Sequence, residues 1–188
     1  MMWRDDEDRS MWDQYSWLSY VKVNQMFAER VVAEHKPGDI IWVHDYHLLL
    51  VPLLVRRMVP DAHIGLFVHS SFPSSELFRC LPQRNHILEG MLGADLICFQ
   101  NQSYARHFLS CCVRICGLEV QGRCVELSNG RVTKVSHNII GIDVERVRYE
   151  ATAPGIELRM HQLRNLYKDK RIIAVSYTHL TLPTIYSV

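Results

Sequence analysis

The chain has 188 residues, of which 48% are hydrophobic and 22% charged, and its formal net charge is +1. This composition is that of an ordinary globular domain with a hydrophobic core. A charge so close to neutral gives no electrostatic basis for binding nucleic acid or an anionic membrane surface, so we expect neither as a partner.

No stretch of the sequence is both apolar enough and long enough to cross a bilayer. The longest apolar run, around residues 48–55, is interrupted by Pro52 and ends in Arg56 and Arg57, which makes it too short for a span. The first residues, MMWRDDEDRSMW, are acidic and lack the apolar core of a signal peptide. We therefore expect a cytoplasmic protein.

The six cysteines are expected to be reduced thiols. None belongs to a C-x-x-C pair, and Cys98 lies inside an apolar strand pattern. Cys112 and Cys116 have a helical spacing of four, and a metal site there would need His107 or His137 as well. Nothing in the sequence supplies that geometry, so no metal is expected.

Helices and strands alternate from the start of the chain. Residues 11–35 carry apolar and aromatic residues at three- and four-residue intervals, which predicts one amphipathic helix, or two in sequence, with the aromatics in the core. Residues 40–43, IIWV, are typical of a parallel strand buried on both faces. Residues 48–58 then predict a helix that tolerates Pro52 only in its first turn, and residues 63–68 predict a second buried strand.

The later elements continue this alternation. They are short helices at 74–78 and 82–90, a strand at 95–100, a helix at 104–116, a β-hairpin at 122–135 around Asn129-Gly130, a strand at 135–140, a helix at 156–167 with Leu158, Leu163 and Leu166 inward, and a strand at 171–175. The order predicts an α/β fold with a Rossmann-like parallel sheet. The Walker, G-x-G-x-x-G and H-E-x-x-H signatures are absent from the sequence.

Titratable side chains follow two consecutive predicted strands. His44, Asp45, Tyr46 and His47 come directly after the first strand, and His69 follows the second. The carboxyl ends of parallel strands meet at one edge of a sheet, and open α/β sheets bind their ligands there. We therefore predict that His44, Asp45 and His69 line one cleft. The alternative is that Asp45 only caps the helix that follows it.

Four segments share their order and spacing with one known family. They are WVHDYHLLLVP (42–52), IGLFVHSSFPSSELFRCLP (64–82), ILEGMLGADLICFQNQSYARHF (87–108) and IIGID (139–143). Together they resemble the trehalose-6-phosphate synthase family of glycosyltransferases, and the match extends over roughly residues 12–175.

The resemblance implies a fold, a reaction and a set of site residues. The fold is GT-B, in which two Rossmann-like halves face each other across a cleft, and the reaction transfers glucose from UDP-glucose to glucose 6-phosphate with retention, giving trehalose 6-phosphate without cofactor or metal. Asp45 would hydrogen-bond the acceptor sugar, and His69 would contact the transferred glucose near the reacting bond. Both would be catalytic, with His44 and Tyr46 beside them in the substrate-binding site.

The resemblance also implies a domain plan. Residues 1–142 would form a partial N-terminal, acceptor-side domain, and residues 143–175 a linker and the start of the donor-side domain. Residues 176–188, SYTHLTLPTIYSV, resemble no part of the family and are interpreted as a non-native tail that packs poorly. The family's glycine-rich donor loop would precede this chain, and its Arg and Lys diphosphate clamp would follow the strand at 171–175. We therefore expect the chain alone to be inactive.

Two positions favour an alternative role. Active synthases of the family usually carry proline where Ser71 stands, and proline before the IGID turn, where Ile139 and Ile140 stand. The run HSSFPSSELFRC is similar to the synthase-like domain of fungal trehalose-phosphate phosphatases or regulatory subunits. The alternative is therefore a non-catalytic regulatory or scaffold domain that assembles with other subunits of a trehalose synthase complex. A third, generic reading is a Rossmann domain that binds another sugar or nucleotide.

Overall fold

The computed structural model describes residues 6–168 and residue 170. The chain divides into two compact units, residues 1–140 and 141–188, which we describe separately. The predicted strand at 171–175 and the predicted tail at 176–188 lie outside the described residues. The domain boundary at residue 142 stays a prediction.

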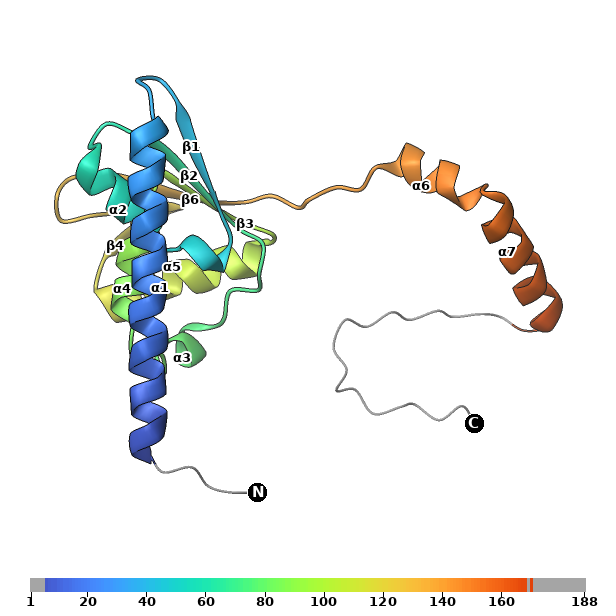
Figure 1. Ribbon diagram of the computed structural model, residues 1–188, viewed down its shortest axis with the longest axis horizontal. Helices are drawn as coiled ribbons and strands as arrows, with labels where there is room; N and C mark the ends of the chain where they lie inside the picture. The colour runs from blue at the N-terminus through green and yellow to red at the C-terminus, as the bar shows by residue number, and fades with distance from the viewer. Residues whose placement is uncertain (1–5, 169, 171–188) are drawn as a thin grey trace. The chain divides into compact units, whose positions relative to one another are not determined.

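The first unit, which begins with the blue helix in Figure 1, is built on a six-stranded sheet with the strand order β1-β2-β3-β6-β5-β4. The strands are β1 Ile40–His44, β2 His63–Val68, β3 Leu96–Phe99, β4 Glu119–Gln121, β5 Cys124–Glu126 and β6 Val132–His137. β1, β2, β3 and β6 are parallel neighbours, whereas β5 pairs with β6 and with β4 in antiparallel fashion. The mostly parallel sheet confirms the predicted α/β class.

The helices alternate with these strands in the chain. In the first unit they are α1 Asp6–Glu34, the 3₁₀ turn η1 Tyr46–Leu48, α2 Val51–Met58, α3 Ser75–Phe78, α4 Arg84–Met91 and α5 Gln102–Cys116. The N-terminal pattern thus forms one helix rather than two. Pro52 lies in the first turn of α2, as predicted, where its missing N–H costs no hydrogen bond. Gly117 ends α5 in the left-handed conformation, with φ 65°.

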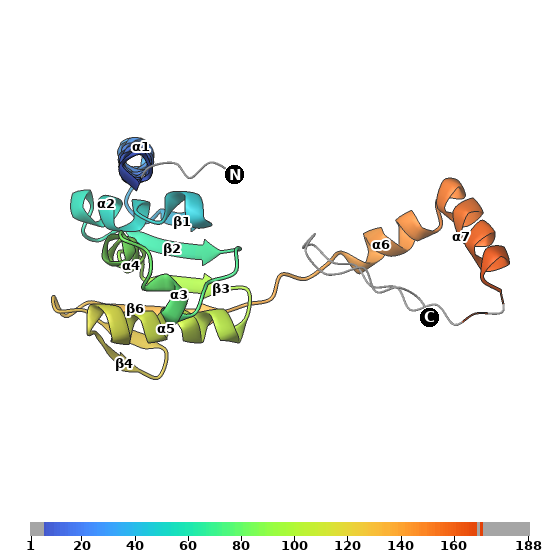
Figure 2. The ribbon, with the colours of Figure 1, turned by 90° about the horizontal axis from the view of Figure 1, so that it is seen from below.

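The core lies between the sheet and one row of helices. α4 packs against both α2 and α5, and α5 also packs on β3 and β6 (Figure 2). Alternate strand residues point toward these helices and are buried; examples are Ile64, Leu66, Ile97, Phe99 and Val135. These side chains join Phe72, Phe78 and Phe108 in one hydrophobic cluster.

The opposite face of the sheet is largely open in the described part of the chain. Ile40, Trp42 and Leu96 point to this face and are 78%, 66% and 44% exposed. The prediction that β1 is buried on both faces is therefore wrong. The helices that pack on the sheet cover its other face. Separately, β1 is an edge strand that pairs only with β2 in this sheet.

β6 replaces two predicted elements. The hairpin around Asn129-Gly130 is confirmed, but its second strand continues to His137 and pairs with β3 as well as with β5. The separate strand predicted at 135–140 is therefore wrong, because residues 138–140 lie outside any strand.

α1 buries only a narrow stripe. Asn24 and Ala28 are fully buried, whereas Tyr15 and Met26 remain 67% and 59% exposed. The prediction that the aromatic residues of this helix are core residues holds only for part of them. Only one face of the helix packs against the rest of the unit, so the residues on its other faces stay exposed.

The second unit contains α6 Val144–Ala151 and α7 Pro154–Leu166. α7 confirms the predicted helix, but Leu158, Leu163 and Leu166 are 64%, 36% and 68% exposed, so their predicted inward position is wrong. α6 was not predicted; its start is capped by Asp143, whose carboxylate accepts a hydrogen bond from the Arg146 N–H at 3.0 Å. Across the residues that the structure describes, no helix combines the length and apolar character that a membrane span requires.

Candidate functional site

The turn after β1 has an unusual backbone at Asp45. Its φ of 61° and ψ of −175° make it the one non-glycine residue with positive φ in the described part of the chain. Its N–H donates to the carbonyl oxygen of Phe67, on the neighbouring strand β2, at 2.8 Å. Non-glycine residues in such conformations cost on the order of 1–3 kcal/mol and concentrate at functional sites, so this outlier directs attention to Asp45.

Ser70 is the main hydrogen-bond partner of the Asp45 carboxylate. The Ser70 N–H donates to Oδ1 at 3.0 Å and the Ser70 hydroxyl donates to Oδ2 at 3.2 Å. The carboxylate makes no capping hydrogen bond to η1, so the alternative reading of Asp45 as a helix cap is not supported. Burial raises the pKa of Asp45, but the hydrogen bonds led by those from Ser70 outweigh it, and the net effect lowers the pKa.

His44 and His69 lie side by side at the same edge. His44 Nδ1 is 3.1 Å from His69 Nε2, within hydrogen-bond distance, and the two ring centroids are 5.3 Å apart. Trp42 packs against His44 and Phe67 against His69, each with centroids 4.6 Å apart. The two rings thus continue an aromatic row on the open face of the sheet.

The structure therefore brings His44, Asp45 and His69 together, as the strand order predicted. Tyr46 differs from them. Its ring is 51% exposed and packs on His47, with centroids 4.0 Å apart. No described contact joins the Tyr46 side chain to the other three residues. The roles assigned to all four residues stay predictions.

Helix α1 fixes the turn that follows Asp45, which sequence reasoning missed. The Asn24 amide donates to the His47 carbonyl at 3.0 Å and accepts from the Leu50 N–H at 3.1 Å. The Tyr20 hydroxyl donates to the Tyr46 carbonyl at 2.8 Å and accepts from the Leu49 N–H at 3.1 Å. The one signal in the sequence was the polar Asn24 on the same face of the helical pattern as the apolar Val21 and Ala28.

A third histidine stands at the carboxyl end of β6. His137 pairs in register with Phe99, and its Nδ1 is buried without a hydrogen-bond partner among the described residues. Sequence reasoning considered His137 only as a metal ligand. Within residues 6–168, no group of three or more His, Cys, Asp or Glu side chains has the geometry to hold a metal ion.

The predicted cleft at this edge stays a prediction. One cavity, of about 430 Å³, lies between α1 and η1 and is lined by Tyr20, Phe27 and His47, among others. A second, of about 440 Å³, lies at the other end of the strands. Neither cavity is lined by Asp45 or His69. What the site offers is an ionised carboxylate and two imidazoles on an exposed sheet edge, groups that can accept and donate hydrogen bonds to sugar hydroxyls.

The sequence of this chain is similar to parts of several curated proteins. The chain is 43% identical over 161 residues to the α,α-trehalose-phosphate synthase [UDP-forming] B of Dictyostelium discoideum, a match that covers 84% of this chain and 20% of that protein. It is 40% identical over 169 residues to the trehalose synthase complex regulatory subunit TPS3 of Saccharomyces cerevisiae, covering 90% of this chain and 16% of that protein. The chain therefore spans about a fifth of the length of these curated relatives.

Solved structures match the described fold. The N-terminal domain of Candida albicans trehalose-6-phosphate phosphatase superposes with a TM-score of 0.76 at 45% identity, over 84% of this chain and 34% of that chain. An E. coli trehalose-6-phosphate structure bound with UDP-2-fluoro glucose gives a TM-score of 0.73 at 28% identity, over 81% and 34% of the two chains. The sheet therefore matches the N-terminal, Rossmann-like half of GT-B trehalose-phosphate synthases.

A family model extends this likeness over nearly the whole sequence. The model of glycosyltransferase family 20 matches residues 1–182. This match covers the strands, the turn at Asp45 and the His44–His69 pair. The chain belongs to glycosyltransferase family 20.

Proposed function

We propose that this chain is the acceptor-side half of a trehalose-6-phosphate synthase, which transfers glucose from UDP-glucose to glucose 6-phosphate with retention of configuration. Family membership supports the reaction class. The E. coli structure bound with UDP-2-fluoro glucose, at 28% identity, supports a glucose nucleotide as donor. The observation that carries the proposal is the cluster of Asp45, His44 and His69 at the carboxyl edge of β1 and β2.

Each group of this cluster has a chemical role in the proposal. Asp45, whose pKa is lowered, stays ionised and accepts hydrogen bonds from the acceptor sugar, since Ser70 occupies only part of its lone-pair capacity. His69 contacts the transferred glucose. His44 orients the His69 ring, because His44 Nδ1 lies 3.1 Å from His69 Nε2. Tyr46 lies at the rim of the substrate site.

Charge on the departing UDP needs cations that this cluster does not contain. Positive groups fixed against a developing charge typically contribute on the order of 10²–10³ in rate each. We place these groups in the donor-side domain, so the 188-residue chain alone is expected to be inactive. The reaction needs no further cofactor, because UDP-glucose itself carries the leaving group, and we place the protein in the cytoplasm, where that donor is made.

The test uses the full-length parent protein. UDP release with both substrates is expected to fall at least 100-fold in Asp45→Ala and in His69→Ala. Asp61→Ala, a change at an exposed turn before β2, is the matched control and should keep its activity. Full activity of both site variants would refute the proposal, and so would clear UDP release by the 188-residue chain.

The second candidate is a regulatory or scaffold domain of a trehalose synthase complex. It is favoured by the 45% identity to the Candida albicans phosphatase N-terminal domain, against 28% to the E. coli structure. Ser71, which stands where active synthases carry proline, is also integrated into the fold, because its hydroxyl hydrogen-bonds the Tyr104 hydroxyl at 2.7 Å. A parent protein that releases no UDP, yet co-purifies with an active synthase subunit, would establish this role instead.

A further inference from the structure

The cavity of about 440 Å³ lies at the end of the sheet opposite Asp45 and His69. It is built from α2, α4, the C-terminal end of α5 and the β5–β6 turn, which precedes the amino end of β6. Its polar lining is Arg57, Asn85, Glu89, Ser128, Asn129 and Arg131, and the remainder is mostly leucine and isoleucine. The volume is within the range of about 300–1,000 Å³ that is usual for small-molecule sites.

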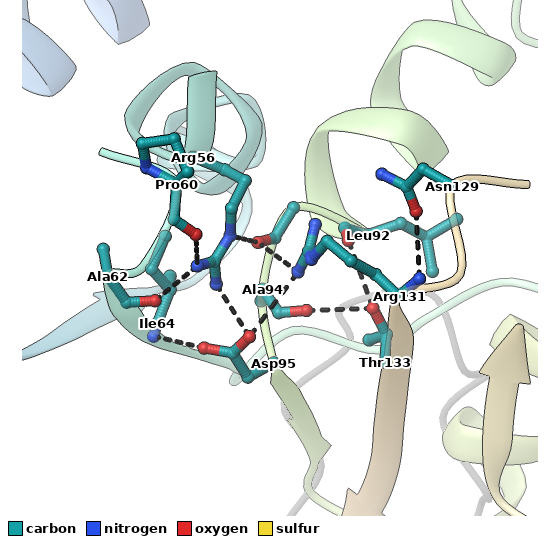
Figure 3. A network of polar contacts seen from close by, with 11 residues as sticks. Arg56, Pro60, Ala62, Ile64, Leu92, Ala94, Asp95, Asn129, Arg131 and Thr133 are labelled. Atoms are coloured by element: carbon teal, nitrogen blue, oxygen red, sulfur yellow. Dashed lines mark hydrogen bonds and ion pairs between the residues drawn. The ribbon is translucent and has the colours of Figure 1, made fainter. Parts of the chain in front are cut away.

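An arginine pair beside the cavity shares one carboxylate (Figure 3). Asp95 Oδ1 lies 2.7 Å from Arg56 Nη2 and 3.5 Å from Arg131 Nη2, while Asp95 Oδ2 accepts from the Ile64 N–H at 2.8 Å. Arg56 also donates to three backbone carbonyls, those of Gly93, Pro60 and Ala62. The closer and better satisfied partner of Asp95 is therefore Arg56.

Arg131 is left with positive charge that Asp95 does not neutralise. Apart from the Asp95 contact, its described side-chain partner is the Gly93 carbonyl, which accepts from Nη2 at 3.2 Å. Burial, together with the like charge of Arg56, lowers the pKa of Arg131. Asp95 raises this pKa, but by less than burial and Arg56 lower it. The Nε and Nη1 donors of Arg131 have no partner in the described part of the chain, so they are the groups that could bind a further anion.

A second cation faces the same space. Arg57 lines the cavity and makes no ion pair with the residues that the structure describes. Glu89 is the acidic residue of the lining, so the two arginines and one glutamate leave a net charge of +1. Both arginines thus belong to the lining of one cavity.

We propose that this cavity binds the phosphate group of a small phosphorylated metabolite. Guanidinium groups match phosphate oxygens with paired, charge-assisted hydrogen bonds, and Arg57 and Arg131 can supply these from two elements. The Asn129 Oδ1 already accepts a hydrogen bond from the backbone N–H of Arg131 at 3.1 Å, so the side-chain nitrogen of Asn129 is the group left to donate. Asn85 and Ser128 add further donors for the remaining oxygens.

Glu89 orients the rest of the ligand. A carboxylate repels a phosphate and accepts hydrogen bonds from hydroxyl groups, so the phosphate lies toward the arginines and the hydroxylated part toward Glu89. The site is separate from the Asp45–His69 cluster and does not depend on the transferase proposal.

The experiment measures binding of inorganic phosphate to the 188-residue chain by amide NMR, at constant ionic strength set with sodium chloride. Saturable shifts are expected in residues 53–57 and 127–131 and not in residues 44–46. Arg57→Gln, at an exposed side chain, should weaken binding on the order of tenfold or more. Glu89→Gln should tighten it several-fold, because it removes the like charge. Arg106→Gln, near the other end of α5, is the matched control and should change nothing.

Opposite effects of the Arg57 and Glu89 variants, together with no effect of Arg106→Gln, would support the site, because a general charge effect would also appear in the Arg106 variant. Absence of saturable shifts, or equal weakening by Arg57→Gln and Arg106→Gln, would overturn the proposal. Glucose 6-phosphate binding no more tightly than inorganic phosphate would overturn the part assigned to Glu89.

Discussion

Ser70 donates both its N–H and its hydroxyl to the two carboxylate oxygens of Asp45, at 3.0 and 3.2 Å. This pair joins the end of β1 to the end of β2, and it holds Asp45 in a backbone conformation with φ 61°. The hydrogen bonds stabilise the ionised carboxylate, which gives the first prediction.

Stability should depend on pH through Asp45. Because its pKa in the folded state lies below the value of about 3.9 in the unfolded chain, the ionised group contributes stability above that value, and this contribution is lost as the pH falls through the folded-state pKa. Asp45→Asn should therefore lower the free energy of unfolding by about 1–2 kcal/mol at pH 7. The difference from wild type should shrink as the pH is lowered from about 5 to about 2.

Urea denaturation at several pH values measures this difference. Asp61→Asn, at an exposed position, serves as the control and should follow the wild type throughout. A constant gap between Asp45→Asn and wild type at all pH values would mean that the hydrogen bonds do not favour the ionised form.

The second prediction concerns Asn24. Its side chain is fully buried and bonds the carbonyls of Tyr20 and His47 and the N–H of Leu50. Leucine at this position would fill a similar volume but leave the His47 carbonyl and the Leu50 N–H without these partners. We expect Asn24→Leu to cost about 2–4 kcal/mol in the free energy of unfolding.

Denaturation monitored by circular dichroism tests this value, with Gln25→Leu on the exposed side of α1 as the control. The amide signals of residues 45–50 should also shift in Asn24→Leu, because α1 fixes that turn. A stable Asn24→Leu variant with an unchanged turn would contradict the anchoring role.

The bounds of β2 could be predicted from the sequence, whereas the side-chain partners at its end could not. β2 was predicted with its observed bounds, His63–Val68, because a polar residue bounds each end of an apolar run. The same logic placed Asp45 and His69 at one edge of the sheet. It could not assign Ser70 to Asp45, because side-chain pairing depends on the turn conformation and not on the period of the strand.

The prediction of burial from the sequence was wrong where burial depends on which elements lie next to a strand in space. An apolar run such as residues 40–43 indicates a strand but does not say which strands or helices flank it, and Trp42 is 66% exposed. The cavity at the amino end of the sheet was missed for the same reason. Arg57, Glu89 and Arg131 lie on three separate elements, and nothing in their spacing along the chain signals that they converge.

The third prediction concerns the close contact of α2 with the end of α4. A Cβ atom on Gly93 would overlap the backbone of Pro52 and Leu53, and helix backbone cannot move aside cheaply. Gly93→Ala should therefore lower the free energy of unfolding by about 1–3 kcal/mol or more. Gly65→Ala is the control, since its Cβ would meet Trp42 Cδ1 at 3.9 Å, an ordinary contact. Thermal denaturation compares the two, and equal stability would contradict the tight packing.

The fourth prediction concerns thiol reactivity. Burial raises the pKa of Cys111 to about 11, with a smaller contribution from Cys116, and burial also raises the pKa of Cys112. At pH 8 only about one Cys111 thiol in a thousand is the reactive thiolate, while Cys80 is exposed.

In the folded protein a disulfide reagent should therefore modify Cys80 within minutes and leave Cys111 and Cys112 intact, as mass spectrometry of the digested product can show. Modification of all three at one rate would show that α5 does not bury them.

The last prediction concerns the open face of the sheet. Ile40 and Trp42 on β1 and Leu96 on β3 place exposed apolar side chains together, and β1 is also an edge strand with unpaired backbone groups. Such a surface binds hydrophobic dyes and promotes association between copies. The double change Ile40→Thr with Trp42→Thr places β-branched residues, which suit a strand, at both positions. It should therefore reduce dye fluorescence and light scattering while leaving the far-ultraviolet circular dichroism unchanged. Leu77→Thr removes a side chain that is 67% exposed on the short helix α3, away from the sheet, and should have little effect on either measurement. If the two proteins lost dye binding equally, the open face would not be the dominant apolar surface of this chain.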